Sequence, residues 1–314
     1  MDGLAYLPRS DYAGLSMASN EQSSVKAPIS CTGIGVHSGL PVTVRLCPAP
    51  ADHGIVFLRT DTGAQVAARH DAVVDTRLCT VLGGEDAASR VGTVEHLMAA
   101  LAGVGIDNLV VEVDGPELPI LDGSAEPWLF LLDCAGRTGL GVERRGIEIL
   151  RTVRVQEGDA FAELRPATDG GPEGLQMNLA IEFAAAAIGA QALSFALDAG
   201  SFRRELSRAR TFAQRREVEG LQQIGLARGG SLDNAIVVDG DSVLNPGGLR
   251  MRDEFVRHKM LDAVGDLALA GAPLHGRFVG SRSGHALNNQ LLHAVFADPA
   301  NWRFRAPAEA LLAA

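Results

Sequence analysis

The sequence predicts an α+β protein built from two units in series. Short β-rich runs bounded by Gly and Pro alternate with stretches in which apolar residues recur every three or four positions. The 314 residues, 46% of them hydrophobic, supply enough apolar side chains for two cores of ordinary size. Gly and Arg cluster at residues 136–146, the best candidate for a linker. We therefore expect domains at residues 23–140 and 147–305 after a disordered lead-in at residues 1–22.

The first unit is predicted to contain three clear strands and two helices. Its strands, chosen for their β-rich composition, are residues 42–46, 55–58 and 109–113. A helix is predicted to start after Thr93 as its N-cap, because apolar residues then recur at helical spacing as far as Val104. The apolar residues 128–134 behind Pro127 predict the second helix.

The second unit repeats the alternation without repeating the sequence. The predicted strands are residues 147–155, 161–164, 175–183, 235–238 and 277–280. The predicted helices are residues 215–224, 254–270 and 285–296. Gly271 and Pro273 provide a stop signal for the long middle helix.

Composition and charge exclude several classes of partner. The 28 Lys and Arg against 38 Asp and Glu give a net charge of −10, which opposes non-specific attraction to nucleic-acid phosphates. Apolar stretches without a charge, such as residues 183–197, fall short of the roughly 20 residues that span a bilayer. We expect neither a nucleic-acid partner nor a transmembrane segment.

The ends and the cysteines point to a reducing compartment. The first twenty residues lack the basic start and apolar middle of an export signal, so we expect a cytoplasmic protein. Four widely separated cysteines form no CxxC pair, which argues against a disulfide framework or a thiolate zinc site. These cysteines are Cys31, Cys47, Cys79 and Cys134.

The segment from Asp253 to Asp266 is the most informative for chemistry. His258 and Asp262 are one helical turn apart, so an imidazole and a carboxylate can converge on one metal ion. Asp266 follows one further turn along the same side. The alternative is an exposed His–Asp pair on a helix, which contributes only a few tenths of a kcal/mol.

A second pair, Glu95 and His96, lies in the first turn of an otherwise apolar helix. His96 would complete three protein ligands with His258 and Asp262, leaving a fourth position open as in a catalytic zinc site. Glu95, about 100° round the helix, could act on a water beside the metal. Alternatively, Glu95 is a favourable anion at a helix N-terminus and His96 a hydrogen-bonded, half-buried residue.

A third segment, residues 280–289, places His285 at a predicted turn from strand to helix. The helix N-terminus disfavours a charged imidazole, whereas a carboxylate such as Asp266 favours it. A general acid must be protonated, so we expect the carboxylate to prevail. The alternative is that His285 only caps its helix.

Together these residues resemble one family, the zinc-dependent deacetylases that act on UDP-3-O-acyl-N-acetylglucosamine in lipid A biosynthesis. The resemblance extends in order from about residue 25 to residue 296. The matching stretches are residues 33–39, 75–80, 93–101, 105–108, 112–125, 208–212, 229–237, 253–266 and 283–289. It implies two consecutive α/β sandwich domains packed with their helices facing each other, and an active site at the domain interface.

The resemblance also implies residue roles. Zinc would be bound by His96, His258 and Asp262, with Glu95 as general base and His285 as general acid. Further implied roles are orientation of His285 by Asp266, and stabilisation of the oxyanion by Thr211 and Lys259.

The substrate implied is an acylated nucleotide sugar, and an insert in the second domain would hold its acyl chain. Positions matching the acyl passage are Phe212, Val218, Ala227, Leu232, Ala235 and Val237. Ala235 and Val237 are equally compatible with an ordinary core. Arg282, three residues before His285, and Lys259 are candidates for the diphosphate. Ala213 and Gln214 replace the family's common Gly and aromatic residue, which leaves the preferred acyl length open.

Two other functions remain as alternatives. A non-catalytic nucleotide-sugar-binding protein would use four protein ligands for a structural zinc and would not need Glu95 or His285. A hydroxyacyl dehydratase would use the histidine and the carboxylate without a metal. We expect a monomeric zinc hydrolase with a small-molecule substrate.

Overall fold

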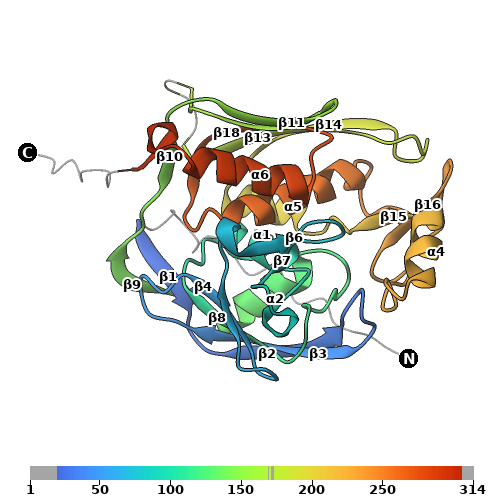
Figure 1. The fold of residues 1–314 in the computed structure, drawn as a ribbon, viewed down its shortest axis with the longest axis horizontal. Helices are drawn as coiled ribbons and strands as arrows, with labels where there is room; N and C mark the ends of the chain where they lie inside the picture. Colours follow the sequence, from blue (N-terminus) through green and yellow to red (C-terminus); the bar gives the residue numbers. More distant parts are fainter. Residues whose placement is uncertain (1–19, 169, 171–172, 306–314) are drawn as a thin grey trace, which may run out of the picture.

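The computed structural model describes residues 20–168, 170 and 173–305. Two sheets lie outermost and enclose two layers of helices (Figure 1). The layers between the sheets contain α1 (Glu95–Val104) and α2 (Glu126–Ala135) from the first half, and α5 (Glu254–Ala268) and α6 (His285–Phe296) from the second. The predicted α+β class is confirmed, and α1 packs directly against α5.

The first sheet has five strands in the order β2-β3-β8-β4-β5. Their bounds are Ile29–Ile34, Pro41–Pro48, Leu109–Val113, Ile55–Arg59 and Gln65–Ala67. In β3 the buried residues alternate with exposed ones, because one face of the sheet packs on the helices and the other faces solvent. A small β-ribbon of β6 (Val73–Asp75) and β7 (Val81–Leu82) lies outside this sheet.

The predicted linker at residues 136–146 is wrong for most of its length. Arg137–Glu143 forms strand β9, which pairs antiparallel with β1 (Glu21–Val25). The Gly-rich sequence of β9 has low β propensity, and this segment forms a strand because β1 supplies its hydrogen-bond partners. The predicted lead-in lies outside the described residues up to residue 19, and its last two residues belong to β1.

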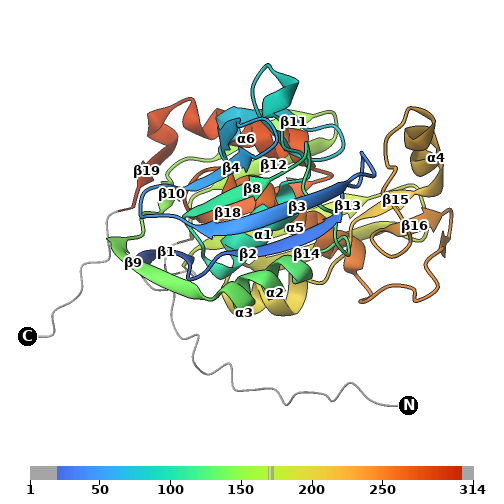
Figure 2. The same cartoon turned by 90° about the horizontal axis from the view of Figure 1, so that it is seen from below.

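The second sheet is centred on β18 (Leu274–Ser281). β18 pairs with β12 (Ala160–Arg165) and, in parallel, with β13 (Leu175–Glu182) and β10 (Ile147–Ile149). Further pairs bring in β11 (Val153–Glu157), β14 (Ala190–Ala196) and β19 (Trp302–Phe304). Figure 2, seen from below, shows the strands of the first sheet in front of α1 and α5.

Two strand predictions for this half are corrected. Residues 147–155 form not one strand but two, β10 and β11, which pair with different neighbours. β14 was not predicted, because its residues 190–196 are mainly small and show no strong β signal. The other short elements are η2 (His70–Ala72), η3 (Ala87–Ser89), α3 (Ala199–Ser201), η4 (Phe202–Leu206) and η5 (Pro299–Asn301).

An insert extends from the second half at one end of the molecule (Figure 1). Its strands β15 (Phe212–Gln214), β16 (Ile236–Asp239) and β17 (Ser242–Val243) form a separate small sheet. The helix α4 (Arg215–Gln223) connects the parallel pair β15 and β16. None of the residues of α4 is buried, so the insert stands out from the main core.

Helix α1 begins one residue later than predicted, and Thr93 is not its N-cap. The N-cap residue is Val94, and Thr93 adopts a positive φ of 56°. This left-handed conformation is costly for a β-branched residue and turns the chain sharply just before Glu95 and His96.

The buried apolar side chains of both halves form one continuous core between the sheets. Leu97 and Leu101 of α1 and Leu261 and Val264 of α5 belong to this core. Within the described ranges, no helix has both the length and the apolar character needed to cross a bilayer.

Candidate active site

Three predicted metal ligands from two helices lie together in the core between the halves. His96 comes from α1, and His258 and Asp262 from α5. One ligand atom of each lies within 4.8 Å of the others. Asp262 Oδ1 is 3.3 Å from His258 Nε2 and 3.6 Å from His96 Nε2. The sequence separation of the helices gives no distance, so this convergence comes from the packing of α1 on α5.

The chemistry of these donors fits a divalent metal ion. The Nδ1 of His258 lies 3.0 Å from the carbonyl oxygen of Ala209, which can only accept a hydrogen bond, so Nδ1 carries the proton. The unprotonated Nε2 therefore has a lone pair with which to bind a metal ion. Burial lowers the pKa of His258 to about 4, so the ring is neutral, as a ligand must be. Although burial disfavours its charge, Asp262 has a pKa well below its ordinary value because His258 and Lys259 lie beside it.

A glycine permits the close approach of the two helices. A Cβ atom on Gly265 of α5 would lie 2.1 Å from the backbone oxygen of Glu95 on α1. No real side chain can occupy such a position without moving one helix. Gly265 therefore sets the distance between His96 and the two ligands on α5.

Glu95 is buried at the start of α1. Its Oε2 accepts a hydrogen bond of 3.0 Å from the backbone N–H of Thr80. Burial raises the pKa of Glu95, which brings this carboxylate nearer to the range useful for a general base. A solvated acid at a helix N-terminus would be exposed, so the burial argues against the simple helix-dipole alternative.

His285 and Asp266 form a second pair beside this cluster. His285 Nδ1 lies 2.9 Å from Asp266 Oδ2 and 3.1 Å from Oδ1. Burial works against a charged imidazole, but the Asp266 carboxylate outweighs it and raises the pKa of His285 to about 9. His285 is the first residue of α6, and the N-cap is Gly284. The protonated form that a general acid needs is thus favoured near neutral pH.

Comparisons with known proteins identify the family to which this fold belongs. A family model described as UDP-3-O-acyl N-acetylglycosamine deacetylase matches residues 22–297. The chain belongs to this deacetylase family. A UDP-3-O-acyl-N-acetylglucosamine deacetylase of Phenylobacterium zucineum (strain HLK1) is 52% identical over 293 residues, which cover 92% of this chain and 98% of the relative. A Pasteurella multocida (strain Pm70) protein of the same name is 48% identical over 288 residues, covering 90% and 92%.

Of two further residues suggested by the deacetylase resemblance, Lys259 contacts the cluster directly. Lys259 donates from Nζ to Asp262 Oδ2 over 2.8 Å, so its ammonium lies against a predicted metal ligand. Thr211 lies at the base of the insert, where its backbone N–H donates to Gly123 and its carbonyl accepts from Ile236. The oxyanion roles of Lys259 and Thr211 remain predictions.

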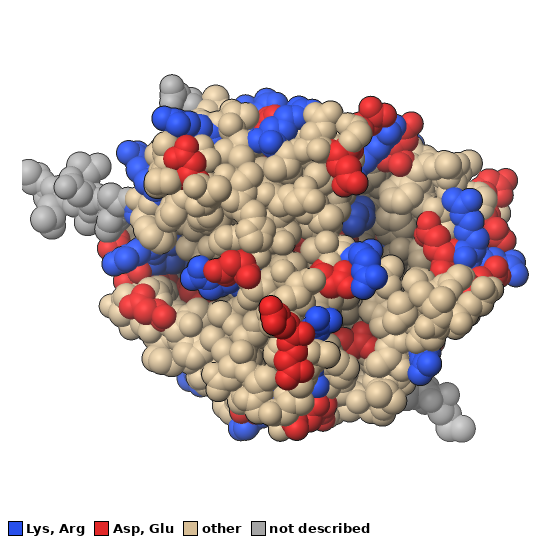
Figure 3. All heavy atoms as spheres, viewed as in Figure 1, with Lys and Arg blue, Asp and Glu red and all other residues tan. Residues whose placement is uncertain are grey.

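The residues predicted for the acyl passage of the deacetylase all belong to the insert. Phe212 lies near a predicted metal ligand, with its ring centroid 6.2 Å from that of His258. Ala213 pairs with Val237 in the parallel strands β15 and β16. Ala227 is buried, Leu232 is exposed, and Val218, Ala235 and Val237 are half-buried. The surface is hollowed where the insert meets the main body (Figure 3).

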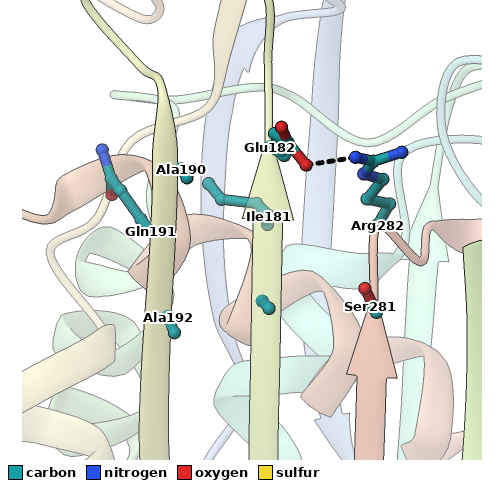
Figure 4. A pocket seen from close by; sticks show the side chains of 8 residues that line it. Ile181, Glu182, Ala190, Gln191, Ala192, Ser281 and Arg282 are labelled. Atoms are coloured by element: carbon teal, nitrogen blue, oxygen red, sulfur yellow. Dashed lines mark hydrogen bonds and ion pairs between the residues drawn. The ribbon is translucent and has the colours of Figure 1, made fainter.

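Arg282 directly follows the end of β18, the central strand of the second sheet. Its guanidinium pairs with the carboxylates of Glu182 and Asp159. It lines a surface pocket of about 280 Å³ together with Glu182 and Gln191 (Figure 4). The diphosphate role of Arg282 stays a prediction, and its guanidinium is paired with carboxylates in this structure.

Sequence reasoning gave no role to three groups that hold this site. They are the backbone carbonyl of Ala209, the hydroxyl of Thr80 and the amide of Asn288. A carbonyl has no sequence signal at all. Thr80 and Asn288 fall within the stretches shared with the deacetylase family, but only the fold shows what they contact.

Proposed function

We propose that this chain hydrolyses the N-acetyl group of UDP-3-O-acyl-N-acetylglucosamine in lipid A biosynthesis and releases acetate. Its family membership makes it a deacetylase, a hydrolase that acts on an amide. The observation that carries the mechanism is the burial of a base, Glu95, and of Asp266 with the part-buried His285 bonded to it, beside the buried His96, His258 and Asp262 cluster. Burying so many polar groups costs folding free energy, and a catalytic role explains why the chain tolerates this cost.

Zinc is the metal we propose for His96, His258 and Asp262, because two imidazoles and one carboxylate with an open position are typical of catalytic zinc sites. Zinc held there would supply Lewis acidity to the amide carbonyl and would make water easier to deprotonate. Lys259 and Thr211 are proposed to stabilise the negative charge that develops on the carbonyl oxygen.

The protein's own residues then move two protons. Glu95 accepts a proton from water as the water oxygen bonds to the carbonyl carbon of the acetamide. When the carbon–nitrogen bond breaks, the bonding pair stays on nitrogen, and His285 donates its Nε2 proton to that nitrogen. Asp266, bonded to Nδ1, orients the ring and stabilises its charged form. The products are acetate and the free amine.

The insert is proposed to bind the acyl chain, since its Phe212 ring lies near His258 and its other predicted passage residues are apolar. Arg282 is proposed to contact the diphosphate after exchanging its carboxylate partners for substrate. These two proposals concern specificity and do not affect the chemistry at the amide.

The test is an assay of acetate release with and without a chelator, together with metal analysis of the purified protein. Wild type should contain about one metal ion per chain and lose activity when it is removed. His258→Ala should lose metal and activity together, whereas Glu95→Ala should keep the metal and lose several orders of magnitude in kcat.

The alternatives give different results in the same assay. A structural zinc protein would release no acetate, and a metal-free dehydratase would contain no zinc. Active His258→Ala protein without metal, or a Glu95→Ala protein with unchanged kcat, would contradict the proposed mechanism.

A further inference from the structure

Thr80 lies between Glu95 and Asp266, the carboxylate that contacts His285, and donates a hydrogen bond to each. It is buried and directly precedes β7. Its backbone N–H donates to Glu95 Oε2 over 3.0 Å, and its hydroxyl donates to Asp266 Oδ1 over 2.6 Å. Glu95 is 15 residues away in sequence and Asp266 is 186 residues away.

We infer that Thr80 is a positioning residue that fixes the general base and the general acid relative to each other across the two halves. The inference rests on the proposed function, because it takes Glu95 and His285 to be the proton-transfer groups. Thr80 itself needs no contact with substrate, since it acts through Glu95 and through Asp266.

At Glu95, the hydrogen bond from Thr80 restricts the rotation of the carboxylate. One oxygen, Oε2, is engaged by the N–H, which directs the pair of oxygens and leaves Oε1 to receive a proton. A glutamate has three rotatable side-chain bonds, so without this anchor its acceptor atom would sample several positions. Any residue except proline at position 80 can supply this contact, because it comes from the backbone.

At Asp266, the contact depends on the side chain of residue 80. A carboxylate paired with a charged imidazole only accepts hydrogen bonds, so the Thr80 hydroxyl is the donor. Asn288 Nδ2 donates to the other oxygen over 2.9 Å, and His285 Nδ1 lies at the same 2.9 Å from it. Thr80 and Asn288 hold the carboxylate from both ends, which fixes the plane against which the His285 ring is aligned.

The link through Thr80 matters for catalysis because it fixes the position of Glu95 relative to Asp266 and His285. Glu95 belongs to the first half, whereas Asp266 and His285 belong to the second, so their spacing depends on how α1 and α5 pack. Through Thr80, one hydrogen bond within the first half and one across the halves connect Glu95 to Asp266. Misplacing a catalytic group by about 1 Å can cost about 100-fold in rate, so such a link affects kcat far more than substrate affinity.

The test compares Thr80→Val, which removes the hydroxyl at nearly constant shape, with Thr80→Ser, which keeps it. Thr80→Val should lower kcat for acetate release about tenfold or more, with KM changed less than about twofold and the metal content unchanged. Thr80→Ser should recover kcat to within about threefold of wild type. Thr80→Ala offers a second removal of the hydroxyl if the valine variant does not fold.

A double-mutant cycle shows whether Thr80 acts through Asp266. In an Asp266→Asn background, Thr80→Val should lower kcat by less than about threefold further, because the acceptor has already been changed. Ser24→Ala is the matched control: its buried hydroxyl donates to Asn108 O over 2.7 Å within the first half, so its loss should cost stability but not kcat.

The outcomes separate this inference from the proposed function. If Glu95→Ala and Asp266→Asn lose kcat but Thr80→Val does not, the role of Thr80 is wrong and the proposed function stands. Loss of metal in Thr80→Val, or a full multiplicative loss of kcat in the Asp266→Asn background, also overturns the inference. A wild-type protein that releases no acetate overturns both.

Discussion

Several individual side chains at this site are ionisable and yet buried. Glu95, His96, His258, Asp262 and Asp266 are each at most 4% exposed. Each finds a polar neighbour in the cluster or beside it, as in the bonds of Glu95 to Thr80 and of Asp266 to His285. Burial lowers the pKa of His258, whereas the Asp266 carboxylate outweighs burial and raises the pKa of His285, which leaves His258 neutral and His285 charged at neutral pH. Their different surroundings thus suit His258 to bind a metal ion and His285 to donate a proton.

The charge state of His285 gives a pH prediction. In metal-free protein, nitrogen NMR of the imidazole should give a pKa of about 9, above the ordinary 6.5. A bound divalent cation repels the imidazolium, so the alkaline fall in activity should lie at or below that pH. Because the folded pKa is raised, stabilisation by this group is complete below pH 6.5 and is lost as pH rises through about 9.

Asp266→Asn tests the cause of that pKa shift. Without the carboxylate, burial prevails and the pKa of His285 should fall below 6.5, with the alkaline limb of the pH–rate profile moving in the same direction. An imidazole pKa that stays near 9 in this variant would show that Asp266 is not its cause.

At the scale of elements, the site depends on the crossing of α1 and α5. Neither helix carries all three ligands, and Gly265 allows the backbones to touch at Glu95. Side chains of both helices contribute to the same core, so the crossing is fixed by packing as well as by the metal ligands.

Gly265→Ala should force the helices apart. We expect the free energy of unfolding to fall by about 1–3 kcal/mol, as for other overpacked contacts, and the zinc dissociation constant to rise at least tenfold. Urea unfolding and chelator competition measure the two effects. Gly220→Ala on the exposed helix α4 is the control, since a Cβ there meets nothing within 4 Å. Equal unfolding free energies and equal zinc dissociation constants in the two variants would show that Gly265 does not set the spacing of α1 and α5.

The insert is a second element with a separable role. Leu232 is 41% exposed, so Leu232→Glu should change stability by less than about 0.5 kcal/mol. A charge in the proposed acyl passage should nevertheless lower kcat/KM for a long-chain substrate about tenfold and leave a short-chain substrate nearly unaffected. Assays with substrates of graded acyl length measure this, and an equal loss at every length would place Leu232 outside the passage.

At the scale of the whole molecule, a metal at this site would connect the two halves. One ligand comes from the first half and two from the second, so ion binding and the association of the halves are linked. Other contacts across the halves include the Arg250–Asp122 and Arg208–Glu126 ion pairs, which are partly exposed and contribute little individually.

Metal removal should therefore lower the thermal stability of the whole chain. With free zinc at about 1,000 times its dissociation constant, binding stabilises the folded state by about 4 kcal/mol, and a chelator should remove that increment. Melting curves with and without chelator, followed by zinc addition, measure it. His258→Ala should show no response to the chelator, and an equal response in that variant would point to a different metal site.

Most of the fold was accessible from the sequence, because its long helices and strands have clear periodicity. The helices at residues 95–104, 254–268 and 285–296 coincide with predicted ones to within a few residues. Two strands were missed for different reasons: β14 pairs with its neighbour β13 but its small residues give a weak β signal, whereas β9 is a strand because of its distant partner β1. Thr93 was misjudged as an N-cap for a related reason, since the surrounding fold imposes its positive φ.

For the candidate site, too, some features follow from the sequence and others only from the tertiary structure. By itself, the sequence determined which side chains were available: their chemistry, and the one-turn spacing that places His258, Asp262 and Asp266 on one side of a helix. Only the tertiary structure decided that His96 meets them, that Thr80 bonds both Glu95 and Asp266, and that one histidine is neutral and another charged. Spacing along a helix is a local property of the chain, whereas distances between helices and the burial that shifts a pKa arise from packing of remote segments.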